Sequence, residues 1–421
     1  MIDFSQIDKL PSYDFVIHLT NRCNLKCEYC FMNGYHKDNA YFDNMSWETY
    51  TKTIDAIAKV ETDRGKAVLF TGGEVLLRDK EFLDRCCKYA VDHLGGASVT
   101  LGLQSNFTLM DDELLEMFKH YGFSMSSSFD TFNPCHDRRH FTDEQRKNIL
   151  EKLQRLHVEV GETGFIMVLH EDNIDTFIDT WNELEKYGLA QKFACLRVVE
   201  NGDFEYRDMK AFSKKVIDIV YKHSLKHGKI ERLFEEDCGF MVEESTAREH
   251  HLCSCGDCTL NSMSIYPDGS IATCFYDKSH PNWHYANIND LGPDDDILKL
   301  REGQKYKDLR KELKAITDRN CKDCPILDPC EGPCWETQGT LDTGIVNKSH
   351  CDIRKYGLLY TYNFLMTMTE EEMFEYTPKM FYILNLDAYD LDGLKAKIEK
   401  NFKDKYLLLC KELNFDENIY E

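Results

Sequence analysis

The chain has 421 residues, which exceeds the size at which a single hydrophobic core stops growing, so two or three domains are expected. Its formal net charge of -23 argues against a nucleic-acid substrate, because a partner made of phosphates binds a basic surface. The N-terminus does not resemble a signal peptide, and the apolar runs are too short to span a bilayer. We therefore expect a cytoplasmic protein with no membrane partner, in which a content of 18 cysteines argues for metal ligation and against a disulfide framework.

Short runs rich in β-branched and aromatic residues alternate with longer periodic segments over the first half of the chain. The short runs predict six strands at residues 15–19, 68–70, 99–103, 123–129, 165–169 and 196–199. Capping residues and terminal glycines predict helices after Ser46 and over residues 79–93, 111–120 and 173–187. Six strand–helix units predict an α/β fold in which a parallel sheet curls into a partial (β/α)6 TIM barrel.

The barrel is expected to occupy residues 14–210, after a short N-terminal segment at residues 1–13. Residues 211–250 are expected to form a helical bridge, and residues 251–357 a cysteine-rich domain. Apolar periodicity around residues 358–368 and 394–413 predicts a helical extension over residues 358–421.

Cys23, Cys27 and Cys30 form a Cx3Cx2C triplet directly after the first predicted strand. Three thiolates on one loop can hold three irons of a [4Fe-4S] cluster, and no fourth cysteine follows nearby, so one iron is left for an exogenous ligand. A structural zinc loop would more often show paired CxxC spacing. With Tyr29 just before its last cysteine, the triplet resembles the signature of the radical S-adenosylmethionine (SAM) superfamily.

This resemblance implies a SAM-binding [4Fe-4S] cluster. In the superfamily the open iron chelates SAM, and an electron from the cluster cleaves the sulfonium to give a 5'-deoxyadenosyl radical that abstracts a substrate hydrogen. The cofactors supply the difficult chemistry, while the protein supplies position and excludes water. A reduced ferredoxin or flavodoxin is the expected electron donor.

Polar motifs follow the predicted strands. Gly72, Gly73 and Glu74 come after the second strand, Asn106 after the third, and Ser128 lies near the end of the fourth. In a parallel barrel these strand ends converge on one face, so distant segments can surround one cofactor. The paired glycines permit close backbone approach, and the glutamate can accept a charge-assisted hydrogen bond from an ammonium group.

The Gly-Gly-Glu sequence resembles the SAM-amino-binding motif of the superfamily, although Val75 stands where the family usually has proline. The resemblance further implies that Asn106 and Ser128 approach the SAM carboxylate or ribose. Residues 136–139 resemble a segment that often ends in a carboxylate-binding arginine. Arg139 lies one position early for that role, which leaves the assignment open.

A second group of cysteines begins at residue 253 and closely resembles the SPASM extension of radical SAM enzymes, which binds two auxiliary [4Fe-4S] clusters. The resemblance assigns Cys274 and Cys334 to the first cluster. One or two further ligands come from three candidates: Cys253, Cys255 and Cys258. Four cysteines are assigned to the second cluster: Cys321, Cys324, Cys330 and Cys351. The alternative is a pair of zinc ribbons, since CxxC pairs suit tetrahedral zinc, but the N-terminal triplet disfavours it.

The Tyr-Pro-Asp-Gly sequence at residues 266–269 predicts a hairpin turn that brings Cys274 back beside Cys258. The remaining cysteines are isolated and are expected to be ordinary thiols: Cys86, Cys87, Cys135, Cys195, Cys238 and Cys410.

The leading hypothesis is a radical SAM/SPASM oxidoreductase that modifies a peptide or protein side chain, with maturation of a ribosomally made peptide through a thioether or carbon–carbon crosslink as the expected reaction. An anaerobic sulfatase maturase, which forms formylglycine, is the alternative. Its catalytic aspartate follows the cysteine equivalent to Cys274, whereas this chain has Phe275 there. Asp277 lies close by and could act as a general base. A metal-binding electron carrier without turnover is disfavoured, because a carrier needs no SAM pocket.

Many peptide-maturing relatives carry an N-terminal domain that binds the leader of the substrate. Only about thirteen residues precede the first predicted strand here. We therefore expect that the substrate is held without such a domain or that a separate leader-binding protein supplies it.

Overall fold

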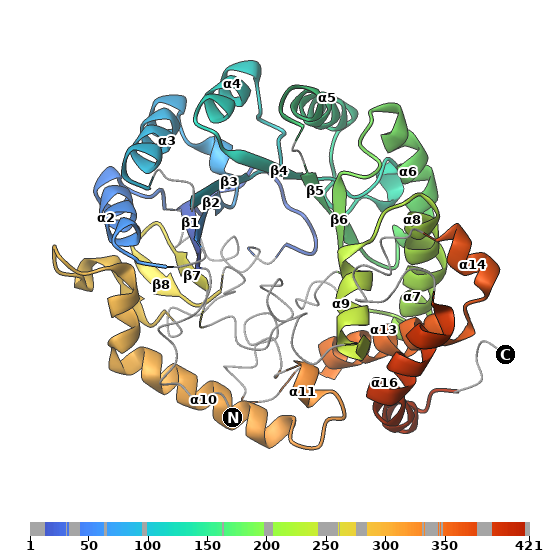
Figure 1. Ribbon diagram of the computed structural model, residues 1–421. Helices are drawn as coiled ribbons and strands as arrows, with labels where there is room; N and C mark the ends of the chain where they lie inside the picture. The colour runs from blue at the N-terminus through green and yellow to red at the C-terminus, as the bar shows by residue number, and fades with distance from the viewer. Residues whose placement is uncertain are drawn as a thin grey trace. The chain divides into compact units, whose positions relative to one another are not determined.

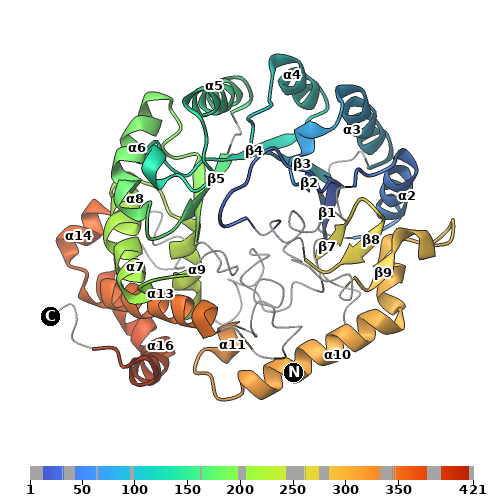
Figure 2. The same ribbon diagram turned by 180° about the vertical axis from the view of Figure 1, so that it is seen from behind.

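A computed structural model describes most of the chain (Figures 1 and 2). The described residues are 13–30, 32, 43–62, 65–94, 99–161, 164–197, 205–242, 260, 262–274, 284–330, 332, 344, 346, 348–376 and 390–416. The chain divides into two compact units. The first unit comprises Met1–Phe129, Arg138–Phe165 and Asp257–Ala315, and the second comprises Asp130–Asp137, Ile166–Gly256 and Ile316–Glu421.

The first unit is built on a sheet in the order β4-β3-β2-β1-β7-β8-β9. Its parallel strands are β1 (Tyr13–Thr20), β2 (Lys66–Gly72), β3 (Val99–Gln104), β4 (Ser124–Ser128) and β7 (Ser262–Ile265). A hairpin then adds β8 (Ser270–Ala272) antiparallel to β7, and β9 (Ala286–Asn287) pairs antiparallel with β8. The hairpin turn at residues 266–269 is therefore confirmed, and Gly269 adopts the positive φ of 83° that such a turn needs. Cys258, which was predicted to lie beside Cys274, is outside the described residues. Sequence reasoning did not foresee that β7 would extend the sheet beside β1.

Helices of the first unit follow its strands in the order that the capping residues predict. They are α2 (Trp47–Ala58), η3 (Val75–Leu77), α3 (Lys80–Leu94), α4 (Asp112–His120), α5 (Asp143–Val160), η9 (Ile288–Asp290), η10 (Ile297–Glu302) and most of α10 (Gln304–Asn320). Ser46 caps α2 by accepting a hydrogen bond from the Thr49 N–H, as predicted. Helix α5 was missed, although Thr142 and Gln145 form a capping box at its start.

The core of the first unit lies between the strands and these helices. Phe15, Ile17 and Leu19 of β1 are fully buried, and so is Phe70 of β2. Tyr50 of α2 packs edge-on against Phe70, with ring centroids 5.8 Å apart. The packing fixes the register of β1, and the register determines where the loop after β1 begins.

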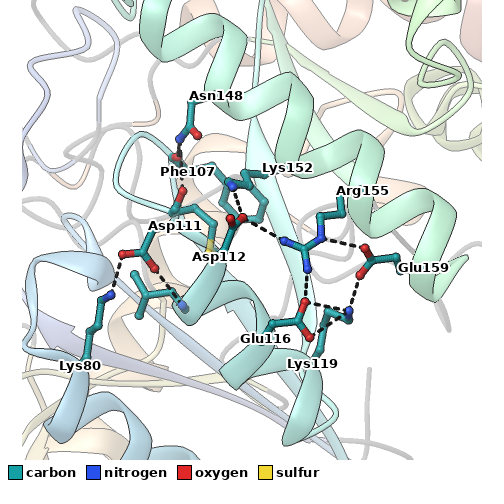
Figure 3. Close-up of polar contacts among 12 residues, drawn as sticks. Lys80, Phe107, Asp111, Asp112, Glu116, Lys119, Asn148, Lys152, Arg155 and Glu159 are labelled. Atoms are coloured by element: carbon teal, nitrogen blue, oxygen red, sulfur yellow. Dashed lines mark hydrogen bonds and ion pairs between the residues drawn. The ribbon is translucent and has the colours of Figure 1, made fainter.

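A network of exposed ion pairs joins α4 and α5 (Figure 3). Arg155 on α5 donates hydrogen bonds to Asp112 and Glu116 of α4 and, at 2.7 Å from its Nε, to Glu159 on its own helix. Lys119 of α4 pairs with Glu116 and with Glu159. Exposed pairs of this kind are screened by solvent, so the network adds little to stability beyond the packing of the two helices.

The second unit is mainly helical. Its neighbouring strands are most of β5 (Gly164–Leu169) and β6 (Phe193–Arg197). Its helices are η4 (Pro134–His136), η5 (Ile174–Thr176), α6 (Phe177–Lys186), α7 (Met209–Lys215), the π-helix η6 (Val216–Tyr221), α8 (Lys222–Lys226), α9 (Arg232–Val242), α11 (Leu327–Cys330), α13 (Lys348–Thr367), α14 (Glu370–Glu375) and α16 (Leu391–Leu413). Helices therefore occur in the predicted bridge, in the predicted C-terminal extension and within the helix predicted over residues 173–187.

A buried carboxylate joins four elements of the second unit, namely α9, β6, η6 and α13. Asp237 of α9 accepts hydrogen bonds from Arg197 of β6 (2.9 Å), from the Tyr221 hydroxyl (2.9 Å) and from the Thr361 hydroxyl of α13 (3.1 Å). Burial raises the pKa of this carboxyl group, and the neighbouring guanidinium opposes the shift.

Among the described helices, none is long and apolar enough to cross a membrane.

Candidate radical SAM site

The predicted cluster ligands lie on the loop that leaves β1. Cys27 is buried, and Cys23 and Cys30 are partly buried. The Leu25 N–H donates to the Cys23 Sγ at 3.4 Å, and the Cys30 N–H donates to the Cys27 carbonyl at 3.1 Å, which folds the loop back on itself. Burial raises the pKa of the Cys23 thiol to about 12, with Glu74 and Cys30 adding to the shift.

Two glycines at the end of β2 allow this loop to start where it does. A Cβ at Gly72 would lie 2.1 Å from the Thr20 carbonyl oxygen, and a Cβ at Gly73 would lie 2.4 Å from the Arg22 carbonyl oxygen. The Gly73 N–H donates to Thr20 at 2.9 Å, and the next N–H, that of Glu74, donates to Arg22 at 2.7 Å. The close approach expected of the paired glycines is thus made to the backbone just before Cys23, and it anchors the cysteine loop to β2.

Glu74 joins the ends of β2 and β3. Its carboxylate accepts hydrogen bonds from the Ser105 hydroxyl (2.7 Å), the Asn106 N–H (2.7 Å) and the Leu76 N–H (2.9 Å). Burial raises its pKa, and these hydrogen bonds oppose the shift. The side chain therefore has a structural role in the loops around the cysteines, whether or not it also receives the predicted ammonium group.

The side-chain amide of Asn106 links the β3 end to the cysteine loop. It donates to Asn24 Oδ1 at 2.9 Å and accepts from both the backbone N–H (2.9 Å) and the hydroxyl (2.6 Å) of Thr108. Asn24 in turn donates to the Thr108 hydroxyl at 2.8 Å. This closed set of hydrogen bonds fixes the orientation of the loop between Cys23 and Cys27.

The remaining predicted SAM contacts lie in the same unit. Ser128 at the end of β4 accepts a hydrogen bond from Gln104 of β3 at 3.2 Å. The Arg139 guanidinium lies 5.3 Å from the centre of the Tyr29 ring, within range of a cation–π contact. Beside it, Glu28 of the cysteine loop pairs with Arg138 and, at 2.9 Å, with His140. The segment that contains Arg139 therefore packs on the cysteine loop.

Sequence reasoning missed an aromatic stack beside the cysteine loop. His18 of β1 stacks on Tyr266 (ring centroids 4.5 Å apart), and Tyr266 stacks on His284 (4.8 Å). The tyrosine packs in a small core with Met32 and Ala272, and Cys30 lies against this core. A single histidine within an apolar strand sequence gave the only signal, because the stacking partners come from distant segments.

His18 is fully buried, and neither of its ring nitrogens has a hydrogen-bond partner among the described residues. Burial, followed by the influence of His284, lowers its pKa to about 3, so the imidazole is neutral at physiological pH. The His18 ring therefore places one neutral hydrogen-bond donor and one acceptor near the end of β1, where the cysteine loop begins.

The four cysteines assigned to the second auxiliary cluster gather in the second unit. Cys321 and Cys324 lie in the turns after α10, Cys330 ends α11, and Cys351 lies in the first turn of α13. The Cys324 N–H donates to the Cys321 carbonyl at 2.9 Å, and the Cys330 N–H donates to the Ile326 carbonyl at 2.9 Å. Burial raises the pKa of Cys321 to about 11 and of Cys351 to about 12, and for both the neighbouring cysteine thiols add to the shift while Lys355 opposes it.

The side chains of both cysteine groups are thiols, which are the ligands that iron–sulfur clusters take. Within the described ranges, no three His, Cys, Asp or Glu side chains are grouped closely enough to hold a single metal ion. Each iron of a [4Fe-4S] cluster takes one cysteine thiolate, and the four thiols of the second set lie near enough to influence one another. Other predicted residues lie outside the described part of the chain: Cys253, Cys255, Cys258, Asp277 and Cys334.

Residues 17–184 match the Radical SAM superfamily. These residues are therefore a Radical SAM domain, as the cysteine triplet predicted, and such a domain implies an oxidoreductase-type enzyme whose cofactors include a [4Fe-4S] cluster and SAM.

Two curated relatives and two solved structures show the likeness in more detail. The radical SAM cyclopropyl synthase TigE of Paramaledivibacter caminithermalis is 24% identical over 80% of this chain and 71% of its own length. The cysteine-type anaerobic sulfatase-maturating enzyme of Clostridium perfringens is 24% identical over 74% of this chain and 85% of its own length.

The structure of anSMEcpe with bound AdoMet and Cp18Cys peptide has a TM-score of 0.65 at 20% identity, covering 84% of this chain and 97% of that one. The structure of Streptococcus suis SuiB bound to precursor peptide SuiA has a TM-score of 0.57 at 15% identity, covering 79% of this chain and 74% of that one. These similarities confirm the predicted α/β fold, with a partial rather than closed barrel.

Proposed function

We propose that this enzyme oxidatively modifies a side chain of a peptide or protein, and that its reaction is the maturation of a ribosomally made peptide through a thioether or carbon–carbon crosslink. The observation that carries the proposal is the second set of cysteines, Cys321, Cys324, Cys330 and Cys351, gathered in one unit of a chain that also holds the radical SAM triplet. This combination supports a SPASM-type enzyme with three [4Fe-4S] clusters. The peptide and precursor peptide bound by the two structural neighbours support the substrate class.

SAM is the oxidant of the proposed reaction, because its conversion to methionine and 5'-deoxyadenosine takes up the two electrons that leave the peptide. When bound, the cluster and SAM supply a 5'-deoxyadenosyl radical. Forming a crosslink removes two hydrogens from the peptide: one leaves in 5'-deoxyadenosine and the other as a proton. The electron used to cleave SAM is returned when the substrate radical is oxidised. The protein must therefore hold the peptide near the cysteine loop, exclude water and accept one electron.

A sulfatase maturase that forms formylglycine is the second candidate, and the similarity to the Clostridium perfringens enzyme favours it. Phe275, in the place of that family's catalytic aspartate, opposes it. The two reactions give different products, because a crosslink joins two residues while formylglycine carries a free aldehyde.

The test uses the full chain reconstituted anaerobically, with SAM, dithionite and the peptides encoded beside its gene. We expect about twelve irons per chain, release of 5'-deoxyadenosine and a peptide lighter by two hydrogens. A peptide aldehyde trapped by a hydrazine reagent would instead establish the sulfatase-type reaction. If the protein carries its full iron content but releases no 5'-deoxyadenosine, both proposed reactions are wrong and an electron carrier is favoured. Cys23→Ala should abolish 5'-deoxyadenosine release, whereas Cys135→Ala, which removes an exposed isolated thiol, should not.

A further inference from the structure

Two cationic side chains of α13 lie among the four cysteines of the second unit. Arg354 Nη1 lies 3.5 Å from the Cys330 Sγ and donates a hydrogen bond to it. The next residue, Lys355, is buried and interacts electrostatically with Cys321 and Cys351. A positive charge beside a thiolate ligand stabilises the more negative, reduced form of a cluster, and hydrogen bonds to the sulfurs act in the same direction.

The hydrogen bond to Cys330 is the direct polar contact of the Arg354 guanidinium, and its two other charged neighbours, Arg197 and Glu236, each form an ion pair with another residue. Arg197 pairs with Asp237 at 2.9 Å, and Glu236 pairs with Arg232 at 3.0 Å. Among the described residues, no carboxylate lies within ion-pair distance of Arg354 itself. The guanidinium therefore places a positive charge next to Cys330, and Glu236 offsets that charge only from beyond ion-pair distance.

Lys355 differs in this respect, because a residue of the C-terminal extension neutralises it. Its Nζ lies 2.6 Å from Glu412 Oε1 near the end of α16. The lysine is 8% exposed and the glutamate 38% exposed. Helix α16 therefore brings a negative charge to the rim of the cysteine site, where it partly offsets the two cations.

We propose that Arg354 and the Lys355–Glu412 pair set the reduction potential of the cluster held by Cys321, Cys324, Cys330 and Cys351, with Arg354 raising it and Glu412 lowering it. These are positioning residues that act through the ligands. The inference rests on the proposed function in one respect, namely that these four cysteines hold a cluster. A raised potential suits a cluster that receives an electron, as an oxidative reaction requires.

The test is a redox titration of the reconstituted full-length protein followed by electron paramagnetic resonance. Cys23, Cys27 and Cys30 are all replaced by alanine so that the SAM-binding cluster gives no signal. The relevant couple is the one lost in Cys321→Ala, which should also lower the iron content by about four per chain.

Arg354→Gln should lower the midpoint potential by the equivalent of an about tenfold change in the redox equilibrium, or about 59 mV for one electron. Arg354→Lys should keep most of the charge effect, and Glu412→Gln should raise the potential. Lys403→Gln is the matched control, because it removes a charge from an exposed pair with Glu399 on the same helix α16 and should cause no shift.

Opposite shifts in Arg354→Gln and Glu412→Gln distinguish a charge effect from loosened packing, which would not reverse sign. The inference is wrong if the couple is present but neither variant moves it, or if both move it in the same direction. Should Arg354→Gln fail to fold, Glu412→Gln decides alone, because the glutamate is partly exposed. If Cys321→Ala loses neither iron nor a signal, the cluster itself is absent, and the three-cluster part of the proposed function falls together with the inference.

Discussion

Replacing Gly73 by alanine tests whether β2 anchors the cysteine loop. The added Cβ would lie 2.4 Å from the Arg22 carbonyl oxygen, 2.6 Å from its carbon and 2.9 Å from the Asn21 carbonyl oxygen. Ordinary contacts begin near 3.4 Å, so the Arg22 carbonyl would have to retreat by about 1 Å. All three atoms belong to the backbone, so no side chain can rotate to make room.

We expect a large loss of stability from this single methyl group. Forcing extra volume into a packed region costs about 1–3 kcal/mol, and the rigid surroundings place Gly73→Ala at the upper end. The two hydrogen bonds that join residues 73 and 74 to Thr20 and Arg22 would also lengthen, at about 1 kcal/mol each. Because Arg22 precedes Cys23, the cysteine loop should shift as well.

Urea unfolding of the metal-free protein, followed by circular dichroism, measures the stability change. The iron content after reconstitution and the release of 5'-deoxyadenosine show whether the cysteine loop has shifted. Gly102→Ala on β3 is the matched control, since its Cβ would be close only to the movable end of the Leu69 side chain, at 3.1 Å, and at an ordinary contact distance of 3.8 Å from the Ser124 carbonyl oxygen. It should change stability by less than about 1 kcal/mol. If Gly73→Ala has the same free energy of unfolding and the same iron content as Gly102→Ala, β2 does not anchor the cysteine loop.

Three further predictions concern stability, each measured by urea unfolding. Burial raises the pKa of Asp14 from 3.8 to about 6, so this carboxyl group lowers stability as the pH rises through that interval; Asp14→Asn should be more stable than wild type at pH 7, with the gain absent below pH 3.8. Asp237→Ala should cost about 3–5 kcal/mol, because it leaves the buried Arg197 charge unpaired. Arg155→Gln removes three ion pairs but should leave the urea midpoint of unfolding unchanged in 1 M salt, because those pairs are exposed (Figure 3). A salt-independent loss in this last variant would contradict the screening argument.

Local sequence was sufficient for most strands and for the capped helices of the first half of the chain. Ser46 and Asp111 mark helix starts that the structure confirms, because a cap depends only on residues within one turn. Helix α5 shows the limit of that approach. Its strongly polar sequence hid its few buried residues, although the capping box at Thr142 was readable.

The spacing of three cysteines predicted a cluster loop with one open iron, and its resemblance to a family signature implied the family and SAM, since both depend on residues close together along the chain. The partners of that loop did not follow from the sequence. The Gly72–Gly73 backbone packs on residues 20–22, the Asn24 amide closes a network with Asn106, and His18 stacks on a tyrosine from the β7–β8 turn.

The sequence by itself determined the kind of protein, namely a strand–helix alternation carrying a three-thiol iron–sulfur motif. Only the tertiary structure decided which charges surround the second set of cysteines, because Arg354 and Glu412 are 58 residues apart and meet that set through the packing of α13 against α16. A local motif depends on short-range geometry, whereas the electrostatic surroundings of a buried site depend on every element that packs around it.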